Sequence, residues 1–427
     1  MRGLNLNLDD ELSRLALQVS GPVGVAVSGG GDSRALLELT CDWAKRSGRD
    51  VFALTVDHGL RPEAIAEARQ VAARCDELGI AHEILTWVPE QKEIGQARSR
   101  RARHALLAKA VTARGGSLLL MGHTFDDQLE TMIMRRGGAS AKDGVDAHEP
   151  GLAGMRALSV SPVWPQGCNV FIGRPALHTR RAALRDYLRA RALTWIEDPS
   201  NQDEKYERVR VRRDLAGQDI AALGKDLAAA SAQRFTRELA IADWMEAHVH
   251  AGDEGLIQVD IENLPSRDIL SDALAWLLMA AAGTDKRARK GPRDRLTDAI
   301  IAAPRNFQTR TLGGAVIAPR QGKIHIARDP GRVPSQLETP SPGDIWDGRF
   351  RFSARLDPCT PAANGSDYCR KSIEIADLSG ILPLARDSFP VCNEGRFIVE
   401  CLVNLRLYAI RKMLCFRFLQ DSPCKIT

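Results

Sequence analysis

The sequence lacks the cysteine and histidine patterns that mark metal and redox sites. Its nine cysteines form no Cys-x-x-Cys pair and no Cys/His array at zinc spacing, which argues against a zinc module. Cys41, Cys75 and Cys168 are expected to be buried small apolar residues. Six cysteines follow position 358, and composition offers no account of them. A disulfide framework is not expected, because such bonds are rare in the cytoplasm.

Long apolar runs and targeting signals are missing as well. The longest apolar stretch, Ala273 to Ala282, is too short to span a bilayer and is expected in a core helix. Acidic residues at positions 9–11 interrupt the start of the chain, so neither a secretory nor a transit signal is expected. A cytoplasmic location and the absence of a membrane partner follow as expectations. Internal repeats and low-complexity tracts are also absent.

The pattern along the first half of the chain is typical of an α/β domain, which we place at residues 1–215. A chain of 427 residues with 44% hydrophobic content is expected to fold into two or three globular domains. The alternation of strands and helices predicts a doubly wound parallel sheet of the Rossmann-like type. Strand-like runs lie at 23–27, 51–56, 82–87, 117–121 and 170–173, and helical stretches at 33–46, 62–78, 96–114 and 179–192.

The remainder divides into a mainly helical middle domain at 216–332, expected to bind RNA, and a small C-terminal segment at 344–427, whose fold is left unassigned. An alanine-rich connecting helix is expected over 216–250 and further helices over 264–303. The turn at 319–322 predicts a hairpin. Proline and serine at 333–343 are typical of a linker.

The most informative stretch is the glycine-rich turn SGGGDS at 28–33. It follows the β-type run Val23 to Val27 and opens a helix, so its backbone amides and the helix dipole favour a phosphate group. No Lys-Ser or Lys-Thr pair ends the turn, which excludes a Walker-type loop. Asp32 beside a phosphate site calls for a divalent cation between them. The turn resembles the pyrophosphatase loop (PP-loop) of enzymes that split ATP into AMP and pyrophosphate.

Polar residues also follow two other strands of the predicted sheet. Asp57 and His58 end the second strand, and the fourth runs into GHTFDDQLE at 122–130. In an open parallel sheet, ligands bind beyond these strand ends. One of Asp126 and Asp127 has a simple alternative role as a helix cap, but capping does not explain both together with Glu130. Such carboxylates need cations, either Mg²⁺ or a positively charged substrate.

The formal charge of +5 is unevenly distributed, because arginines are concentrated in three clusters at 98–103, 180–191 and 208–213. Any one of them is equally well explained as a solvated helix face. Beside a nucleotide-binding loop, three such clusters favour a polyanionic substrate such as RNA.

Together these motifs resemble one family, tRNA(Ile)-lysidine synthetase. The resemblance covers about residues 20–215 and weakens toward 330. It rests on SGGGDS, VDHGLR at 56–61, GHTFDDQLET at 122–131, WIEDPSNQD at 195–203, and on Arg100, Arg103, Leu106, Gly151, Leu152, Gly154, Met155, Arg174, Pro175, Leu177, Arg208, Arg210 and Arg212. Two positions depart from the family, which commonly has Asn at Val209 and Tyr at His104.

The resemblance implies a ligase that adenylates the C2 oxygen of the wobble cytidine of tRNA(Ile) with a CAU anticodon. Free L-lysine then displaces AMP to give lysidine, with ATP and Mg²⁺ required. The implied residues are Asp32, Asp127, Glu130 and Arg103 for catalysis; Ser28, Gly29, Gly30, Gly31, Asp32, Ser33, Asp57, His58 and His123 for ATP; Asp127 and Glu130 for lysine; Arg100, Arg174, Arg181, Arg185, Arg208 and Arg212 for tRNA; and Asp32 for Mg²⁺. The oligomeric state is left open, with a homodimer as one alternative.

Two alternatives remain at this point. A PP-loop enzyme that thiolates tRNA cytidine would need paired cysteines for a cluster or a sulfur relay. A catalytically inert RNA-binding protein of the same fold would not need Asp32, Asp127 and Glu130.

Overall fold

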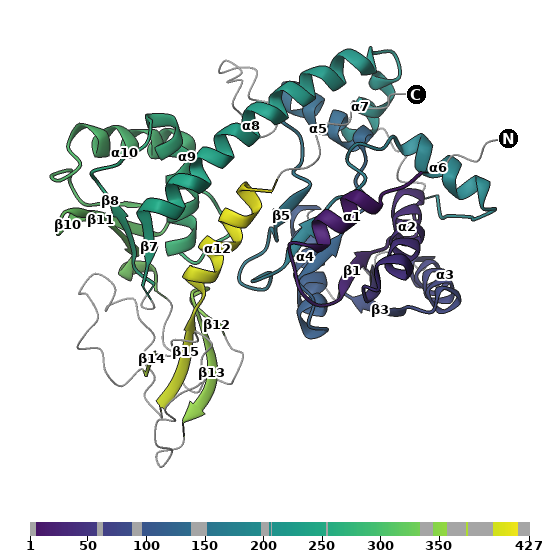
Figure 1. The fold of residues 1–427 in the computed structure, drawn as a ribbon, viewed down its shortest axis with the longest axis horizontal. Helices are drawn as coiled ribbons and strands as arrows, with labels where there is room; N and C mark the ends of the chain where they lie inside the picture. The colour runs from purple at the N-terminus through teal and green to yellow at the C-terminus, as the bar shows by residue number, and fades with distance from the viewer. Residues whose placement is uncertain are drawn as a thin grey trace. The chain divides into compact units, whose positions relative to one another are not determined.

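The computed structural model describes residues 6–57, 63–87, 96–137, 152–197, 205, 207–252, 255–333, 345–356, 373–374 and 396–416. Contacts divide the chain into two compact units. The first contains the described residues up to Pro162, those from Asn169 to Thr236, and Phe416. The second contains Val163–Cys168 and the described residues from Arg237 to Cys415 (Figure 1). The domain boundaries expected at 215 and 332 stay predictions.

The first unit is built on a six-stranded sheet in the order β3-β2-β1-β4-β6-β5. Its parallel strands are β1 (Val23–Ala26), β2 (Val51–Asp57), β3 (Ala81–Thr86), β4 (Leu118–Leu120) and β6 (Phe171–Gly173). The short edge strand β5 (Leu158–Val160), which the sequence analysis did not predict, pairs antiparallel with β6. The predicted doubly wound α/β fold is therefore confirmed.

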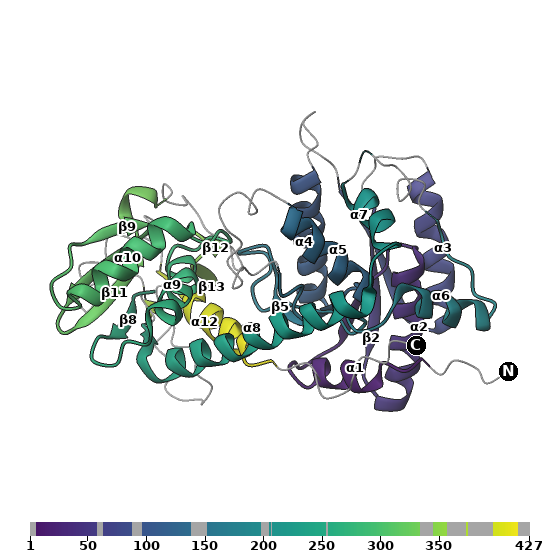
Figure 2. The same cartoon turned by 90° about the horizontal axis from the view of Figure 1, so that it is seen from above.

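Helices flank this sheet (Figure 2). They are α1 (Asp9–Ala16), α2 (Gly31–Ser47), α3 (Glu63–Leu78), α4 (Gln96–Ala113), α5 (Phe125–Gly137) and α6 (Arg181–Ala190). The central strands are apolar on both faces, with Val23, Val25 and Leu118 fully buried, as expected of strands covered on two sides. Strand order reverses between β1 and β4, which places the ligand site of such a sheet beyond their carboxyl ends.

Two helices from later in the chain pack beside α5. They are α7 (Glu207–Leu215) and α8 (Ile220–His248), and their Leu215 and Leu227 share a buried apolar cluster with Phe125, Leu129 and Met132 of α5. This packing brings the arginines of α7 to the carboxylates of α5. Helix α8 is the connecting helix that the sequence predicts.

The second unit contains an antiparallel five-stranded sheet in the order β7-β8-β11-β10-β9. Its elements are β7 (Val249–Ala251), β8 (Ile257–Asp260), α9 (Arg267–Ala281), α10 (Lys290–Ala302), β9 (Arg310–Leu312), β10 (Ala315–Arg320), β11 (Lys323–Arg328) and the short 3₁₀ helix η3 (Pro330–Arg332). The pairing of Ala315–Arg320 with Lys323–Arg328 confirms the predicted hairpin. Helices hold more of residues 220–332 than strands do, although β7, β8 and β9 were not predicted.

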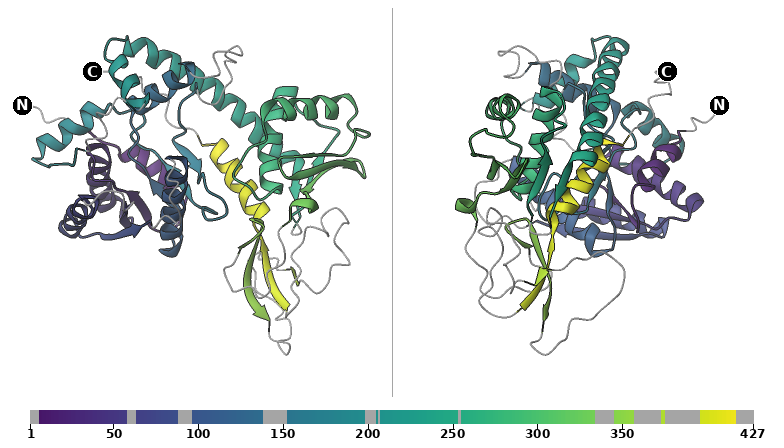
Figure 3. Two further views of the ribbon diagram at one scale, coloured as in Figure 1. Left: turned by 180° about the vertical axis from the view of Figure 1, so that it is seen from behind. Right: turned by 60° about the vertical axis from the view of Figure 1, so that its left-hand side comes forward.

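The C-terminal segment contributes a second antiparallel sheet, in the order β12-β13-β15-β14, and one helix. Its elements are β12 (Ile345–Trp346), β13 (Phe350–Leu356), β14 (Ile373–Glu374), β15 (Arg396–Cys401) and α12 (Leu402–Leu414). Strands β13 and β15 lie side by side, and α12 follows β15 directly (Figure 3). The linker expected at 333–343 falls almost wholly outside the described residues. No helix in the described part of the chain is both long and apolar enough to cross a membrane.

Candidate active site

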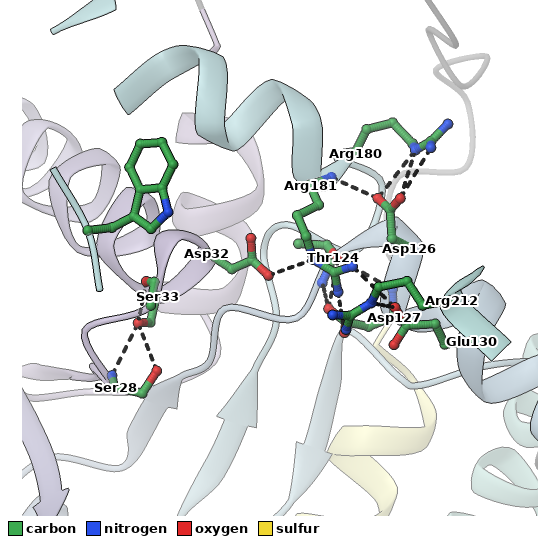
Figure 4. A network of polar contacts seen from close by, with 12 residues as sticks. Ser28, Asp32, Ser33, Thr124, Asp126, Asp127, Glu130, Arg180, Arg181 and Arg212 are labelled. Carbon is green, nitrogen blue, oxygen red and sulfur yellow. Dashed lines mark hydrogen bonds and ion pairs between the residues drawn. The ribbon is translucent and has the colours of Figure 1, made fainter. Parts of the chain in front are cut away.

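The glycine-rich turn is braced by its own two serines at the start of α2. The Ser28 amide donates to Ser33 Oγ at 3.1 Å (Figure 4). Ser33 Oγ in turn donates to the carbonyl of Gly30 at 3.0 Å. Gly29 has φ of +82°, which a residue with a side chain rarely adopts. The serines therefore hold the turn in shape, and the first amides of α2 stay available to an anion.

Two other segments press closely on this turn. A Cβ atom added to Gly122, just after β4, would lie 3.0 Å from the Asp32 carbonyl oxygen and the Ser33 nitrogen. The Ile196 amide donates to the Gly29 carbonyl at 3.0 Å. A Cβ on Gly31 would lie 3.3 Å from the Trp195 ring. A side chain at Gly122 or Gly31 would therefore press on the turn or on Trp195. Trp195 forms a wall of the loop, a place that the sequence analysis did not give to this residue of the WIEDPSNQD motif.

Both aspartates at the start of α5 have structural partners. Asp127 Oδ2 accepts hydrogen bonds from the Thr124 amide and hydroxyl, each at 2.7 Å, in a capping-box arrangement. Asp126 Oδ2 accepts from the Arg181 amide at 2.7 Å, and this amide is the first of α6. Its carboxylate also pairs with the Arg180 side chain at 3.2 Å. Capping therefore explains both aspartates, where the sequence analysis allowed it for only one.

The remaining carboxylate oxygens meet guanidinium groups. Glu130 is fully buried and pairs with Arg181 at 3.1 Å, Arg208 at 2.5 Å and Arg212 at 2.9 Å. Asp127 Oδ1 contacts Arg181 at 2.9 Å and Arg208 at 2.6 Å. These arginines are three of the six predicted to bind tRNA. Here they supply the cations that the sequence analysis expected from Mg²⁺ or a substrate.

Arg181 links this group to the nucleotide turn (Figure 4). Its Nε lies 3.0 Å from Asp32 Oδ2, while its two terminal nitrogens contact Asp127 and Glu130. Burial alone would lower the pKa of Arg181, but the three carboxylates together raise it well above its ordinary value. Burial raises the pKa of Asp32 despite the attraction of Arg181, so this carboxylate lacks full compensation by positive charge.

A cluster of positive and titratable groups lies beside the carboxylates. It contains Arg100, Arg103, His104, His123 and Arg174. In the described part of the chain, several buried nitrogens of this cluster have no hydrogen-bond partner: Nε of Arg103 and Arg174, Nδ1 of His123 and both ring nitrogens of His104. Arg174 is only 9% exposed. The Nε–H groups of the two arginines are donors, and buried donors without acceptors are costly unless a ligand satisfies them. The arginines of this cluster are therefore suited to an anion.

The pKa values of the cluster reflect burial first and neighbouring guanidiniums second. Burial and the neighbouring guanidinium groups lower the pKa of His104 to about 3 and that of Arg174 to about 10. The pKa of His123 is also well below its ordinary value, through burial and the charge of Arg174. Both histidines are therefore neutral near pH 7. Arg156, which also lowers the pKa of Arg174, and His104 were not predicted as site residues. His104 follows Arg103 directly and is one of the two departures from the family, and Arg156 follows Gly154 and Met155, which carry the resemblance.

Most of the predicted residues that the structure describes come together at the ends of β1 and β4. Asp57 ends β2 and is buried, whereas His58 lies outside the described residues. Arg185 lies on α6 within electrostatic range of Asp32, and its Nε has no hydrogen-bond partner among the described residues. Within the described residues, no group of three or more His, Cys, Asp or Glu side chains is arranged to hold a metal ion. The roles assigned to individual residues, including Mg²⁺ at Asp32, stay predictions.

Fold and turn together define an ATP-binding domain of the PP-loop class. Residues 5–218 match the family model described as a PP-loop domain. Three curated relatives carry the name tRNA(Ile)-lysidine synthase. The one from Hyphomonas neptunium is 44% identical over 319 residues, covering 73% of this chain and 83% of the relative. The Caulobacter vibrioides protein is 33% identical, covering 87% and 83%, and the Brucella anthropi protein 34%, covering 93% and 85%. This chain belongs to the tRNA(Ile)-lysidine synthase family.

Proposed function

We propose that this chain joins lysine to the C2 position of the wobble cytidine of tRNA(Ile) with a CAU anticodon. ATP first adenylates the C2 oxygen and releases pyrophosphate, and the lysine amine then displaces AMP to give lysidine. Family membership supports ATP-dependent modification of tRNA. The observation that carries the finer proposal is the meeting of three groups at one sheet edge: the nucleotide turn, the cationic cluster and the carboxylates of α5.

Each of these groups suits one requirement of the reaction. The first amides of α2 and the helix dipole suit the ATP phosphates. The unpartnered nitrogens of Arg103 and Arg174 suit the negative charge that develops as the phosphate is transferred. Asp127 and Glu130 suit the ammonium group of an amino-acid substrate. A flipped or already unstacked cytidine of the anticodon loop can reach such an edge.

Mg²⁺ fits this site through Asp32. Magnesium in nucleotide sites is commonly held by one or two carboxylates together with phosphate oxygens and water. Asp32 is the acidic residue of the turn, and its raised pKa marks a carboxylate with room for more positive charge. When bound, the ion would supply charge neutralisation on the phosphates. The chain's own part is to position Asp32 at the first turn of α2.

The thiolation alternative is less well supported by the cysteines. Cys41 and Cys75 are buried, and burial raises the pKa of the Cys41 thiol to about 12 and that of Cys75 to about 11. The thiolate is the reactive form of cysteine, so neither residue suits a sulfur relay. The inert RNA-binding alternative accounts for the structural contacts of Asp127 and Glu130. It does not account for the incompletely compensated carboxylate of Asp32 at the nucleotide turn.

The experiment is a pyrophosphate-release assay with purified protein, ATP and Mg²⁺. We expect release that requires tRNA(Ile) with a CAU anticodon and is much weaker with methionine tRNA of the same anticodon. Attachment should then require lysine. Norleucine should not replace it, because it lacks the side-chain amine of lysine and so has no ammonium group at that end to pair with Asp127 and Glu130. Bound tRNA without pyrophosphate release would favour the inert protein, and a sulfur-containing nucleoside would favour the thiolase.

A further inference from the structure

Arg181 holds a central place between the two halves of the site. It is the first residue of α6. Its three guanidinium nitrogens contact three carboxylates, at 3.0 Å (Asp32), 2.9 Å (Asp127) and 3.1 Å (Glu130). One carboxylate belongs to the nucleotide turn and two belong to α5. A single side chain therefore contacts negative charge on both sides.

The charges around the α5 carboxylates are already compensated. Asp127 and Glu130 together contact three guanidiniums, those of Arg181, Arg208 and Arg212. The side chain of Arg181 is only 13% exposed, whereas those of Arg208 and Arg212 are 41% and 36% exposed. At Asp127 and Glu130, an incoming ammonium group thus meets carboxylates that guanidiniums already compensate. It has to displace a guanidinium, and the buried one blocks the interior side.

The nucleotide turn offers Arg181 another partner. Its Nε already touches Asp32, a residue of the first turn of α2, where phosphate groups bind. The phosphates of ATP carry more negative charge than the α5 carboxylates, and a guanidinium matches phosphate oxygens well. Binding of ATP should therefore draw Arg181 away from Asp127 and Glu130.

We propose that Arg181 couples the two substrate sites: it fills the place of the lysine ammonium until ATP binds, and so enforces binding of ATP before lysine. This inference rests on the proposed function. Arg181 is then a positioning residue with two sets of partners. Because coupling is reciprocal, lysine should tighten ATP binding by the same factor.

The test measures lysine binding by equilibrium dialysis with labelled lysine, Mg²⁺ and tRNA(Ile), with and without an α,β-methylene analogue of ATP. In the unaltered chain the analogue should tighten lysine binding about tenfold, within the usual range of coupling. In Arg181→Met, lysine should bind about tenfold more tightly without the analogue, because one competing charge is gone. The analogue should then change affinity less than about twofold.

Two further variants make the test specific. Arg46→Met removes an arginine from the other end of α2, where it pairs with Asp9 at 2.6 Å, and should behave as the unaltered chain. Arg181→Lys keeps the charge but contacts fewer carboxylates at once, so its response to the analogue should shrink. This variant carries the test if Arg181→Met does not fold, and an undiminished response in it would overturn the inference.

Contrary outcomes fall into two kinds. Weaker lysine binding in Arg181→Met would show that the arginine holds the lysine carboxylate, and an undiminished analogue effect in that variant would exclude coupling through it. Either result overturns this inference while leaving lysine attachment by the unaltered chain intact. If the unaltered chain neither binds lysine nor attaches it to tRNA, the proposed function itself is wrong.

Discussion

Replacing Glu130 by Gln should destabilise the first unit more than any comparable change at the surface. Glu130 is fully buried and accepts from three guanidiniums, at 3.1, 2.5 and 2.9 Å. Hydrogen bonds to charged groups contribute about 1.5–3 kcal/mol each, and removing one partner of a buried ion pair costs about 3–5 kcal/mol. Glutamine keeps one acceptor oxygen, and Arg208 and Arg212 are exposed enough to turn to water. We therefore expect a loss of about 3 kcal/mol.

The assay is urea denaturation at pH 7, with Glu83→Gln as the matched control. Glu83 pairs with Arg114 at 3.1 Å, but its side chain is 42% exposed. Exposed pairs contribute about 0–1 kcal/mol, so the control should lose less than about 1 kcal/mol. A Glu130→Gln variant as stable as the control would refute the reasoning, because it would mean that the carboxylate is not needed to hold the three arginines together.

Three further predictions concern the turn and the cationic cluster. Asp32→Asn should slow pyrophosphate release at least ~10²-fold, which is the scale of losing one preorganised electrostatic group. Its circular dichroism spectrum should match that of the unaltered chain, and a near-normal rate would contradict the role of the turn. The pKa of His104 is lowered from 6.5 to about 3 in the folded chain, so the unaltered chain should lose about 2 kcal/mol of stability from this group between pH 7 and pH 5. His104→Tyr should not show this loss, which urea titrations at the two pH values would measure. Equal losses in the variant and the unaltered chain would be the contrary result. Gly122→Ala should raise the KM for ATP, because its Cβ would lie 3.0 Å from backbone atoms of the turn. Gly217→Ala is the control: its Cβ would meet no described atom within 4 Å, so its KM should not change. Equal KM values for the two variants would contradict the close approach.

The sequence predicted the first unit well because its signals are local. Hydrophobic runs such as Val23 to Val27 have the length and β-branching of buried strands, and each is followed by a turn and a helix. The position of SGGGDS and GHTFDDQLE at strand ends then followed from the rule that parallel strands present their carboxyl ends at one edge. The C-terminal strands lack such periodicity. The residues of Phe350–Leu356 pair with residues of Arg396–Cys401 that lie 40 to 51 positions further along the chain, and a local pattern cannot reveal this pairing.

The partners of the arginines could not be predicted for the same reason. Arg181 and Arg208 were each expected on a face directed at RNA, since a cluster of like charges signals a surface. In the structure both pair with Asp127 and Glu130 instead. That contact depends on the packing of α6 and α7 near α5, far apart in the chain, and only the fold brings those helices together. Binding of tRNA by these arginines remains a prediction.

The most direct test of the central proposal is mass spectrometry of nucleosides from tRNA(Ile) with a CAU anticodon. The purified chain would be incubated with this tRNA, ATP, Mg²⁺ and isotope-labelled lysine. We predict that the wobble cytidine gains the mass of labelled lysine less one water, as in lysidine, and that Asp32→Asn abolishes the gain. An unmodified cytidine despite confirmed tRNA binding, or a cytidine that has gained sulfur, would contradict the account.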